Sequence, residues 1–440
     1  MKRYVWKELP VSRQQALLSR PALADDATLR GAVSAIIERV RNEGDAALLD
    51  LTAKYDRVQL ASLEVEDAEF EAAAGDLTAV ERDAIEAAAA NIEKFHAAQV
   101  PAPISIETAA GVRCERVTRP IERVGLYVPA GSAPLPSTAL MLGIPARLAG
   151  CATRAMCSPV QADGRVDSAV LYAARVSGVE RVFKLGGAQA IAALAYGTET
   201  IPKVDKIFGP GNTWVTEAKD QVDRDPAGAA RDYPAGPSEV LVIADAAADA
   251  GFVAADLLSQ AEHGADSQVL LLTTSAELAD AVAEQVAVQK ARLDRREVID
   301  RALAHSSLIV VESLTAAFEI ANRYAPEHLI LQIERPREWL ARVQAAGSVF
   351  LGPWTPESVG DYCSGTNHVL PTYGFARNHS SLGVGDFLRS MTVQELTIEG
   401  IKNIGPIAET LATLEGLDAH ARAVSERLAA AGSARTGGSS

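Results

Sequence analysis

The sequence predicts an α/β fold with two Rossmann-like, doubly wound parallel-sheet domains and helical N- and C-terminal extensions. Three observations lead to this prediction. The chain has 440 residues, which is too long for one ordinary core. Short β-rich runs alternate with amphipathic stretches in two separate series. A stretch rich in Pro, Gly and Ala, DRDPAGAARDYPAGPS, lies between the two series and is typical of a crossing between domains.

The elements follow in order along the chain. Residues 27–100 are predicted to be mainly helical. The first β/α series begins at residue 122 and alternates runs such as ERVGLYVPAG and RVFKLGG with helix-like runs such as STALMLGIPARLAG. The second series begins with SEVLVIAD at residues 238–245 and continues through SQVLLLTT, SSLIVVES, EHLILQIE and SVFLGPW. From about residue 385 the chain is again predicted to be helical.

These runs divide the chain into five expected parts. They are an N-terminal extension (1–26), a main α/β domain (27–128 plus 237–380), a second α/β domain (129–236), a C-terminal helical segment (381–432) and a flexible tail (433–440).

Composition limits the function classes. A net charge of −15 argues against nucleic acid or an anionic membrane surface as the main partner. The N-terminus has no signal-peptide core, and no run approaches the roughly 20 apolar residues of a membrane span. The four cysteines form no C-x-x-C pattern, which favours reduced, buried thiols. We therefore expect a cytoplasmic enzyme.

Three glycine-containing loops follow strands of the first series. They are residues 127–131, the GGAQ segment at 186–189 and the GPGN segment at 209–212. Each alone is most simply a tight turn, and none matches G-x-G-x-x-G. Because loops after parallel strands share one sheet edge, where helix N-termini favour phosphate, the three together favour a nucleotide.

Gln260 and His263 lie one turn apart at the end of a predicted helix, so both side chains can point the same way. One interpretation is a metal site with mixed N and O ligands. Asp361 and His420 are its candidate completions, and such a set suits zinc, with manganese or cobalt as alternatives. The other interpretation is a helix C-terminal His with a solvated Gln, which two residues alone favour.

Glu327 and His328 begin a predicted strand and can titrate near neutrality when buried. Adjacent strand residues point to opposite faces, which argues against a joint role. Pro326 makes an irregular strand start plausible, so the residues alone leave the question open. His368 is close in sequence to Asp361 and is a candidate site residue. His96 is expected at the surface.

The strings GLYVPAG, KLGGAQAIAALAYGT, DKIFGPGNTWVTEAK, PAGPSEVLVIAD, DLLSQAEHGADSQVLLLT, APEHLI and PESVGDYCSGTNHVLPT resemble the L-histidinol dehydrogenase family. The resemblance spans about residues 25–428. One departure is Cys363, where a smaller residue is expected. No basic neighbour that could activate its thiol is evident, so we interpret it as structural.

The resemblance implies an NAD-dependent enzyme with one Zn²⁺ per subunit, which oxidises L-histidinol through L-histidinaldehyde to L-histidine. It implies catalytic roles for Glu327 and His328. The implied metal ligands are Gln260, His263, Asp361 and His420. The implied substrate contacts are Ser238, His368 and Glu415, together with His328 and the metal ligands. The implied NAD contacts are Tyr127, Gln189 and Asn212.

The resemblance also implies a homodimer with shared active sites. The main domain would carry the metal and catalytic residues, and residues 129–236 would contribute to NAD binding. The segment 381–432, with Glu415 and His420, would dock on the partner subunit and serve its site.

Three alternatives remain open. The chain could oxidise another alcohol, such as a sulfonated diol, with the same zinc and NAD residues. It could be a zinc hydrolase that binds no nucleotide. It could be a catalytically silent binding protein, against which the complete set of candidate ligands and acid–base residues argues.

Overall fold

The computed structural model describes residues 1–20, 27–130, 133–233 and 236–433. The chain forms two compact units. Unit 1 contains residues 1–99 and 121–387, and unit 2 contains residues 100–120 and 388–440. The predicted flexible tail beyond residue 433 and residues 21–26 of the predicted N-terminal extension lie outside the described residues.

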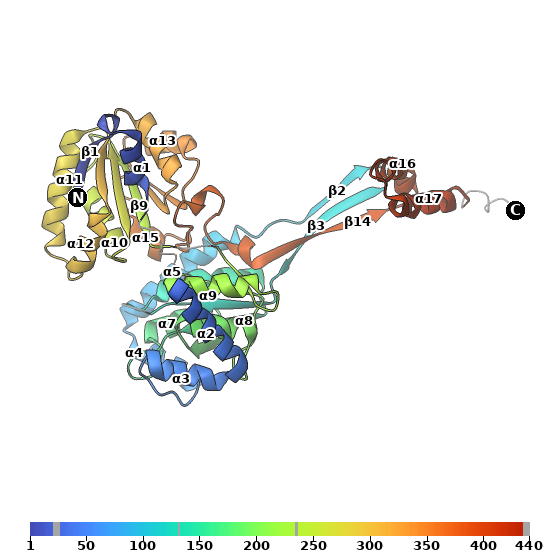
Figure 1. The fold of residues 1–440 in the computed structure, drawn as a ribbon, viewed down its shortest axis with the longest axis horizontal. Helices are drawn as coiled ribbons and strands as arrows, with labels where there is room; N and C mark the ends of the chain where they lie inside the picture. The colour runs from blue at the N-terminus through green and yellow to red at the C-terminus, as the bar shows by residue number, and fades with distance from the viewer. Residues whose placement is uncertain (21–26, 131–132, 234–235, 434–440) are drawn as a thin grey trace. The chain divides into compact units, whose positions relative to one another are not determined.

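Unit 1 contains a six-stranded parallel sheet with the order β1-β11-β10-β9-β12-β13 (Figure 1). The strands are β1 (Lys2–Val5), β9 (Glu239–Ala244), β10 (Gln268–Thr273), β11 (Ser307–Val310), β12 (His328–Gln332) and β13 (Ser348–Leu351). Every residue of β9, β10 and β12 is buried, because helices cover both faces of the sheet.

One face of this sheet packs on α10 (Ala250–Ala261), α11 (Ala276–Lys290) and α12 (Arg296–Ala304). The other face packs on α1 (Val11–Leu18), α13 (Leu314–Tyr324) and α14 (Pro336–Trp339). The first strand of the chain, β1, pairs with β11 at the sheet edge, so residues 2–5 belong to this sheet.

A five-stranded parallel sheet, with the order β6-β5-β4-β7-β8, lies in the same unit. Its strands are β4 (Arg123–Tyr127), β5 (Thr153–Ser158), β6 (Arg181–Lys184), β7 (Lys206–Phe208) and β8 (Ala230–Arg231). One cluster packs α4 (Asp67–Asp76), α5 (Ala79–Ala97), α6 (Pro136–Ala149) and α7 (Ser168–Val176) on it. A second cluster brings in α2 (Ala27–Glu43), α3 (Asp45–Tyr55), α8 (Gly187–Tyr196) and α9 (Thr213–Arg224).

Both sheets are doubly wound, as the sequence predicts. The strand order reverses between β4 and β7 in one sheet and between β9 and β12 in the other. The expected division placed residues 27–128 with residues 237–380 in the main α/β domain, and the structure differs there. Helices α2 to α5 and strand β4 belong to the five-stranded sheet, because their apolar side chains pack there and not on the six-stranded sheet.

The remaining elements of unit 1 are short. They are α15 (Glu357–Tyr362), η1 (Trp6–Glu8), η2 (Leu340–Arg342), η3 (Phe375–Arg377) and η4 (Val384–Phe387).

Unit 2 is a three-stranded antiparallel sheet with two helices. It consists of β2 (Ile104–Ala109), β3 (Val112–Pro120), β14 (Leu388–Leu396), α16 (Ile398–Leu414) and α17 (Asp418–Ser433). The two helices confirm the helical prediction for the C-terminal segment. The prediction is wrong for residues 388–396, which form a strand that pairs with β3 from Leu388–Pro120 to Leu396–Val112.

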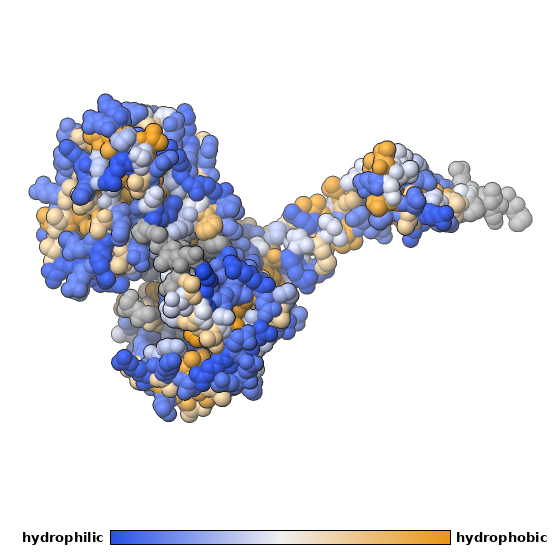
Figure 2. Space-filling view, in the orientation of Figure 1, coloured by the Kyte–Doolittle hydropathy of each residue, from blue (hydrophilic) through white to orange (hydrophobic). Residues whose placement is uncertain are grey.

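Unit 2 exposes many large apolar side chains on its strands and on α16 (Figure 2). They include Ile104, Ile106, Met391, Val393, Ile407, Leu411 and Leu414. None of the helices in the described ranges is long and apolar enough to cross a bilayer.

Candidate active site

A cavity of about 1160 Å³ lies in unit 1, lined by residues of both parallel sheets and their loops. One wall contains Tyr127, Gln189 and Asn212, the expected NAD contacts. The opposite group of lining residues includes Ser238 and His263, which the sequence predicts as substrate and metal contacts. The cavity therefore joins the carboxyl ends of β4 and β7 to the amino end of β9, as the order of the runs suggests.

Tyr127 ends β4, and its hydroxyl accepts a hydrogen bond of 3.0 Å from the backbone N–H of Gly187 at the start of α8. Burial raises the pKa of Tyr127 to about 12, so the phenol stays neutral and can donate to a ligand. Gln189 is buried in the first turn of the same helix. The next loop approaches closely, since a Cβ on Gly209 (φ +121°) would lie 2.1 Å from the carbonyl oxygen of Tyr127.

Asn212 is the N-cap of α9, where its side-chain oxygen accepts from two backbone N–H groups of the first turn. Both α8 and α9 therefore begin at this wall. The positive ends of two helix dipoles suit an anionic group such as a pyrophosphate.

His328 and Glu327 lie at the start of β12, and both are buried. Nδ1 of His328 lies 3.1 Å from the carbonyl oxygen of Glu239, the first residue of the neighbouring β9. Nε2 has no hydrogen-bond partner among the described residues. Its nearest carboxylate oxygen, Oδ1 of Asp361, is 3.6 Å away, beyond hydrogen-bond reach.

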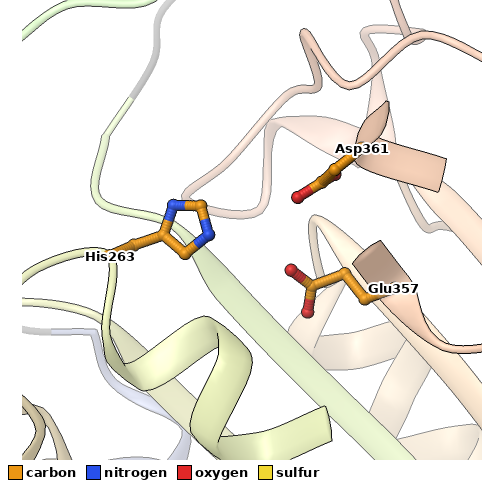
Figure 3. Close-up of side chains that lie close together, drawn as sticks. All are labelled: His263, Glu357 and Asp361. Carbon is orange, nitrogen blue, oxygen red and sulfur yellow. The ribbon is translucent and has the colours of Figure 1, made fainter. Parts of the chain in front are cut away.

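A cluster suited to a metal ion adjoins this pair. His263, Glu357 and Asp361 each offer a ligand atom, and these atoms lie within 4.8 Å of one another. Figure 3 shows the imidazole of His263, from the end of α10, facing the two carboxylates of α15. Gln260, one turn earlier in α10, is fully buried. When its amide nitrogen is turned toward α15, it donates to both oxygens of Glu357 at 3.0 Å.

Negative charge accumulates around His328. Burial raises the pKa of Glu327 and of Glu357 to about 8. Burial lowers the pKa of His328, but the surrounding carboxylates outweigh this effect and raise it to about 10. Burial also lowers the pKa of His263, which lies at the cavity wall, so its imidazole is neutral and able to bind a metal. The site therefore requires a positive charge, either a proton or a cation.

The structure brings most of the predicted site residues together within unit 1. Two of them, Ser238 and His263, line the cavity. The others contact His263 or one another next to it; they are Gln260, Glu327, His328 and Asp361. His368 joins them, because its Nδ1 lies 2.7 Å from the backbone oxygen of Asp361 and its Nε2 3.2 Å from the Thr138 hydroxyl. Glu415 and His420 belong to unit 2, where both side chains are exposed.

Glu357 is a site residue that the sequence did not predict. It is buried, and it lies four residues before Asp361 in PESVGD, the spacing that places two side chains on one helix face.

The expectation that His96 lies at the surface is wrong. Its side chain is fully buried, because the end of α5 packs on α6, and its Nδ1 lies 2.8 Å from the Ile92 carbonyl. Cys363 is exposed, unlike the buried thiols expected, while Cys151 and Cys157 are buried.

A family model described as histidinol dehydrogenase matches residues 19–428. The chain belongs to the histidinol dehydrogenase family.

The family relationship extends over whole chains. A histidinol dehydrogenase of Vibrio vulnificus (strain YJ016) is 56% identical over 428 residues, which cover 97% of this chain and 98% of the relative. That of Xanthomonas oryzae pv. oryzae is 58% identical and covers 98% of this chain and 100% of the relative. The crystal structure of histidinol dehydrogenase from Elizabethkingia anophelis superposes with a TM-score of 0.95 at 48% identity, covering 98% of both chains.

Proposed function

We propose that this chain oxidises L-histidinol to L-histidine in two steps, through L-histidinaldehyde, with the reduction of two NAD. The observation that carries the proposal is the position of Nε2 of His328. This buried nitrogen has no partner among the described residues, and it lies beside a cluster of metal-ligand side chains at a cavity large enough for a dinucleotide. Family membership over the whole chain supports the choice of histidinol.

The residues present fit a zinc ion. Gln260, His263 and Asp361 offer amide oxygen, imidazole nitrogen and carboxylate oxygen, which are ligand types that zinc accepts. The excess of buried carboxylates around them also favours a cation. Zinc bound there would hold the imidazole and amine of histidinol and would compensate the charge that otherwise keeps a proton on His328. Manganese or cobalt would suit the same ligands.

In the first step, His328 accepts the hydroxyl proton through Nε2 while the carbon loses a hydride. NAD, held against Tyr127, Gln189 and Asn212, would accept the hydride. The product is the aldehyde. Holding it in the cavity prevents the loss of a reactive intermediate.

In the second step, water adds to the aldehyde to form a hydrate, which must then lose a hydride and a proton to become a carboxylic acid. Glu327 is the candidate to activate the water, and its pKa of about 8 suits a general base. The two side chains are neighbours, with Nδ1 of His328 and Oε2 of Glu327 3.6 Å apart. His328 again accepts the proton.

We further propose that the active protein is a homodimer in which Glu415 and His420 of one subunit complete the substrate and metal sites of the other. Two observations support this. Gln260, His263 and Asp361 are three of the implied zinc ligands, and zinc sites have four, so His420 would be the fourth. The apolar side chains exposed on unit 2 are of the kind that subunit interfaces cover. The cytoplasmic location stays a prediction.

The decisive experiment combines the zinc content with the amount of NADH formed per histidinol consumed. We expect about one zinc per subunit and a ratio near two NADH. A ratio near one would leave only the alcohol oxidation. No NADH from histidinol by zinc-loaded protein would refute the proposal, and a panel including sulfonated diols would then identify an alternative alcohol.

A further inference from the structure

Glu239, the first residue of β9, contacts both members of the Glu327–His328 pair. Its backbone N–H donates to Oε2 of Glu327 at 2.8 Å, and the backbone N–H of Glu327 donates to Oε1 of Glu239 at 3.2 Å. Each glutamate thus satisfies the backbone N–H of the other at the starts of two neighbouring parallel strands. This reciprocal pair fixes one oxygen of the Glu327 carboxylate.

The carbonyl of Glu239 also determines where His328 carries its proton. A carbonyl oxygen can only accept, so the contact of 3.1 Å requires a hydrogen on Nδ1 of His328. The amide nitrogen of Gln260 also lies 3.0 Å from Nδ1, but it can direct both hydrogens to the oxygens of Glu357. With the proton on Nδ1, the neutral imidazole has its lone pair on Nε2, the nitrogen without a partner.

Arg20, two residues after α1, holds Glu239 in turn. Its Nε and one terminal nitrogen donate to the two oxygens of the Glu239 carboxylate, and its guanidinium carbon lies 3.9 Å from the centre of the Tyr324 ring. The side chains of Arg20 and Glu239 are 11% and 2% exposed. Two parallel hydrogen bonds fix the orientation of both groups in a buried pair of this kind. Removing one partner leaves a buried charge unpaired.

The same guanidinium also binds the turn that leads into β12. The terminal nitrogen that donates to Glu239, Nη2, also donates to the backbone oxygens of Tyr324 at 2.9 Å and of Ala325 at 3.3 Å. Ala325 has φ +54° and ψ +69°, a left-handed conformation that a residue with a Cβ adopts only when its surroundings enforce it. Arg20 therefore connects the start of β9 to the turn that sets the position of Glu327.

We propose that Arg20 and Glu239 are positioning residues for the oxidation. They hold the Glu327 carboxylate and keep the His328 proton on Nδ1, so that Nε2 faces the substrate as a base. Neither residue touches the substrate. The proposal rests on the roles proposed above for Glu327 and His328.

The test compares Arg20→Met, Arg20→Lys and Glu239→Gln with the wild-type zinc-loaded enzyme. We expect Arg20→Met and Glu239→Gln to lower kcat by about 10- to 100-fold for both histidinol and histidinaldehyde, with the KM for histidinol and the zinc content nearly unchanged. Arg20→Lys keeps the charge without the fork and should recover part of kcat. Arg13→Met, in α1, is the matched control, because Arg13 donates to the exposed Tyr4 hydroxyl and should leave kcat unchanged.

Chemical rescue separates positioning from folding. A second cavity, of about 630 Å³, reaches Arg20 and Gln268 from outside the active site. Millimolar guanidinium should therefore raise kcat of Arg20→Ala several-fold and leave that of Arg20→Met unchanged. If Arg20→Ala or Arg20→Met fails to fold, Arg20→Lys takes its place. A positioning role then predicts a lower kcat for Arg20→Lys with the KM for histidinol nearly unchanged.

The outcomes distinguish the two proposals. Wild-type kcat in Arg20→Met or Arg20→Lys, together with a large loss in Glu327→Gln, would overturn the positioning role alone. Wild-type kcat in Glu327→Gln would overturn the role of Glu327 whatever Arg20 does. Loss of zinc, or a KM effect equal to the kcat effect, would make Arg20 a general structural residue and would also overturn the inference.

Discussion

Replacing Glu357 with Ala tests whether the buried carboxylate missed by the sequence analysis supports the metal site. Glu357 accepts from the amide of Gln260 at 3.0 Å in a fully buried position, so the variant leaves that amide without its charged acceptor. Loss of a hydrogen bond to a charged group costs about 1.5–3 kcal/mol. If that cost falls on the zinc-bound state, zinc affinity should drop about 10- to 100-fold, since 1.4 kcal/mol is a factor of ten.

The assay is competition for zinc against a chromogenic chelator, with turnover measured at limiting and at saturating zinc. Glu357→Gln should lie between the wild type and Glu357→Ala, because its amide oxygen can still accept from Gln260. Glu338→Gln is the control, since Glu338 is exposed and pairs with a surface arginine. Wild-type zinc affinity and turnover in Glu357→Ala would refute the reasoning.

Three further predictions use the same protein. His328→Ala should nearly abolish histidinol oxidation while zinc stays bound, measured by NADH absorbance and metal content, and full turnover would contradict the base assignment. In the metal-free protein, Glu327 and Glu357 have pKa values raised to about 8 and that of His328 is raised to about 10. The folded state therefore binds more protons than the unfolded state between about pH 5 and 10, so the melting temperature in chelator should fall as pH rises across that window. A rise would refute the charge assignment. Mixing a His420→Ala subunit with a Gln260→Ala subunit should restore activity if sites are shared, and verified heterodimers without activity would contradict sharing.

The fold could be predicted from the sequence where local patterns decide the structure. The run EVLVIA is apolar throughout and must be buried on both faces, which implies a parallel sheet covered by helices. Strand β14 shows where this fails. Its partner, β3, lies about 270 residues earlier. Eight of the nine residues of β14 are exposed, and only Leu388 is half-buried. No local apolar period therefore distinguishes it from an exposed helix.

The site shows the same division between local and long-range information. Gln260 and His263 could be found because they are three residues apart at a predicted helix end, although α10 ends at Ala261 and His263 follows it. Glu357 follows a proline in the first turn of a short helix, where an acidic residue is already explained by the helix dipole. Only its burial against Gln260, about 100 residues earlier, reveals a role. Arg20 and Glu239 are a similar case, because their pairing crosses 219 residues.

The cavity separates opposite charges because the two sheets present opposite edges to it. At the carboxyl ends of β4 and β7, α8 and α9 begin at the cavity, and the positive ends of their dipoles would favour the phosphates of a dinucleotide. At the amino ends of β9 and β12, the first backbone N–H groups bind carboxylates instead, so Glu239 and Glu327 gather there beside the acidic helix α15. Negative charge at that end attracts a metal ion and the amine of a substrate, and it would repel the phosphates. On the proposed function, the phosphates of NAD and the amine of the substrate would thereby be directed to opposite ends of one cavity, and the reacting carbon would lie between them, near His328.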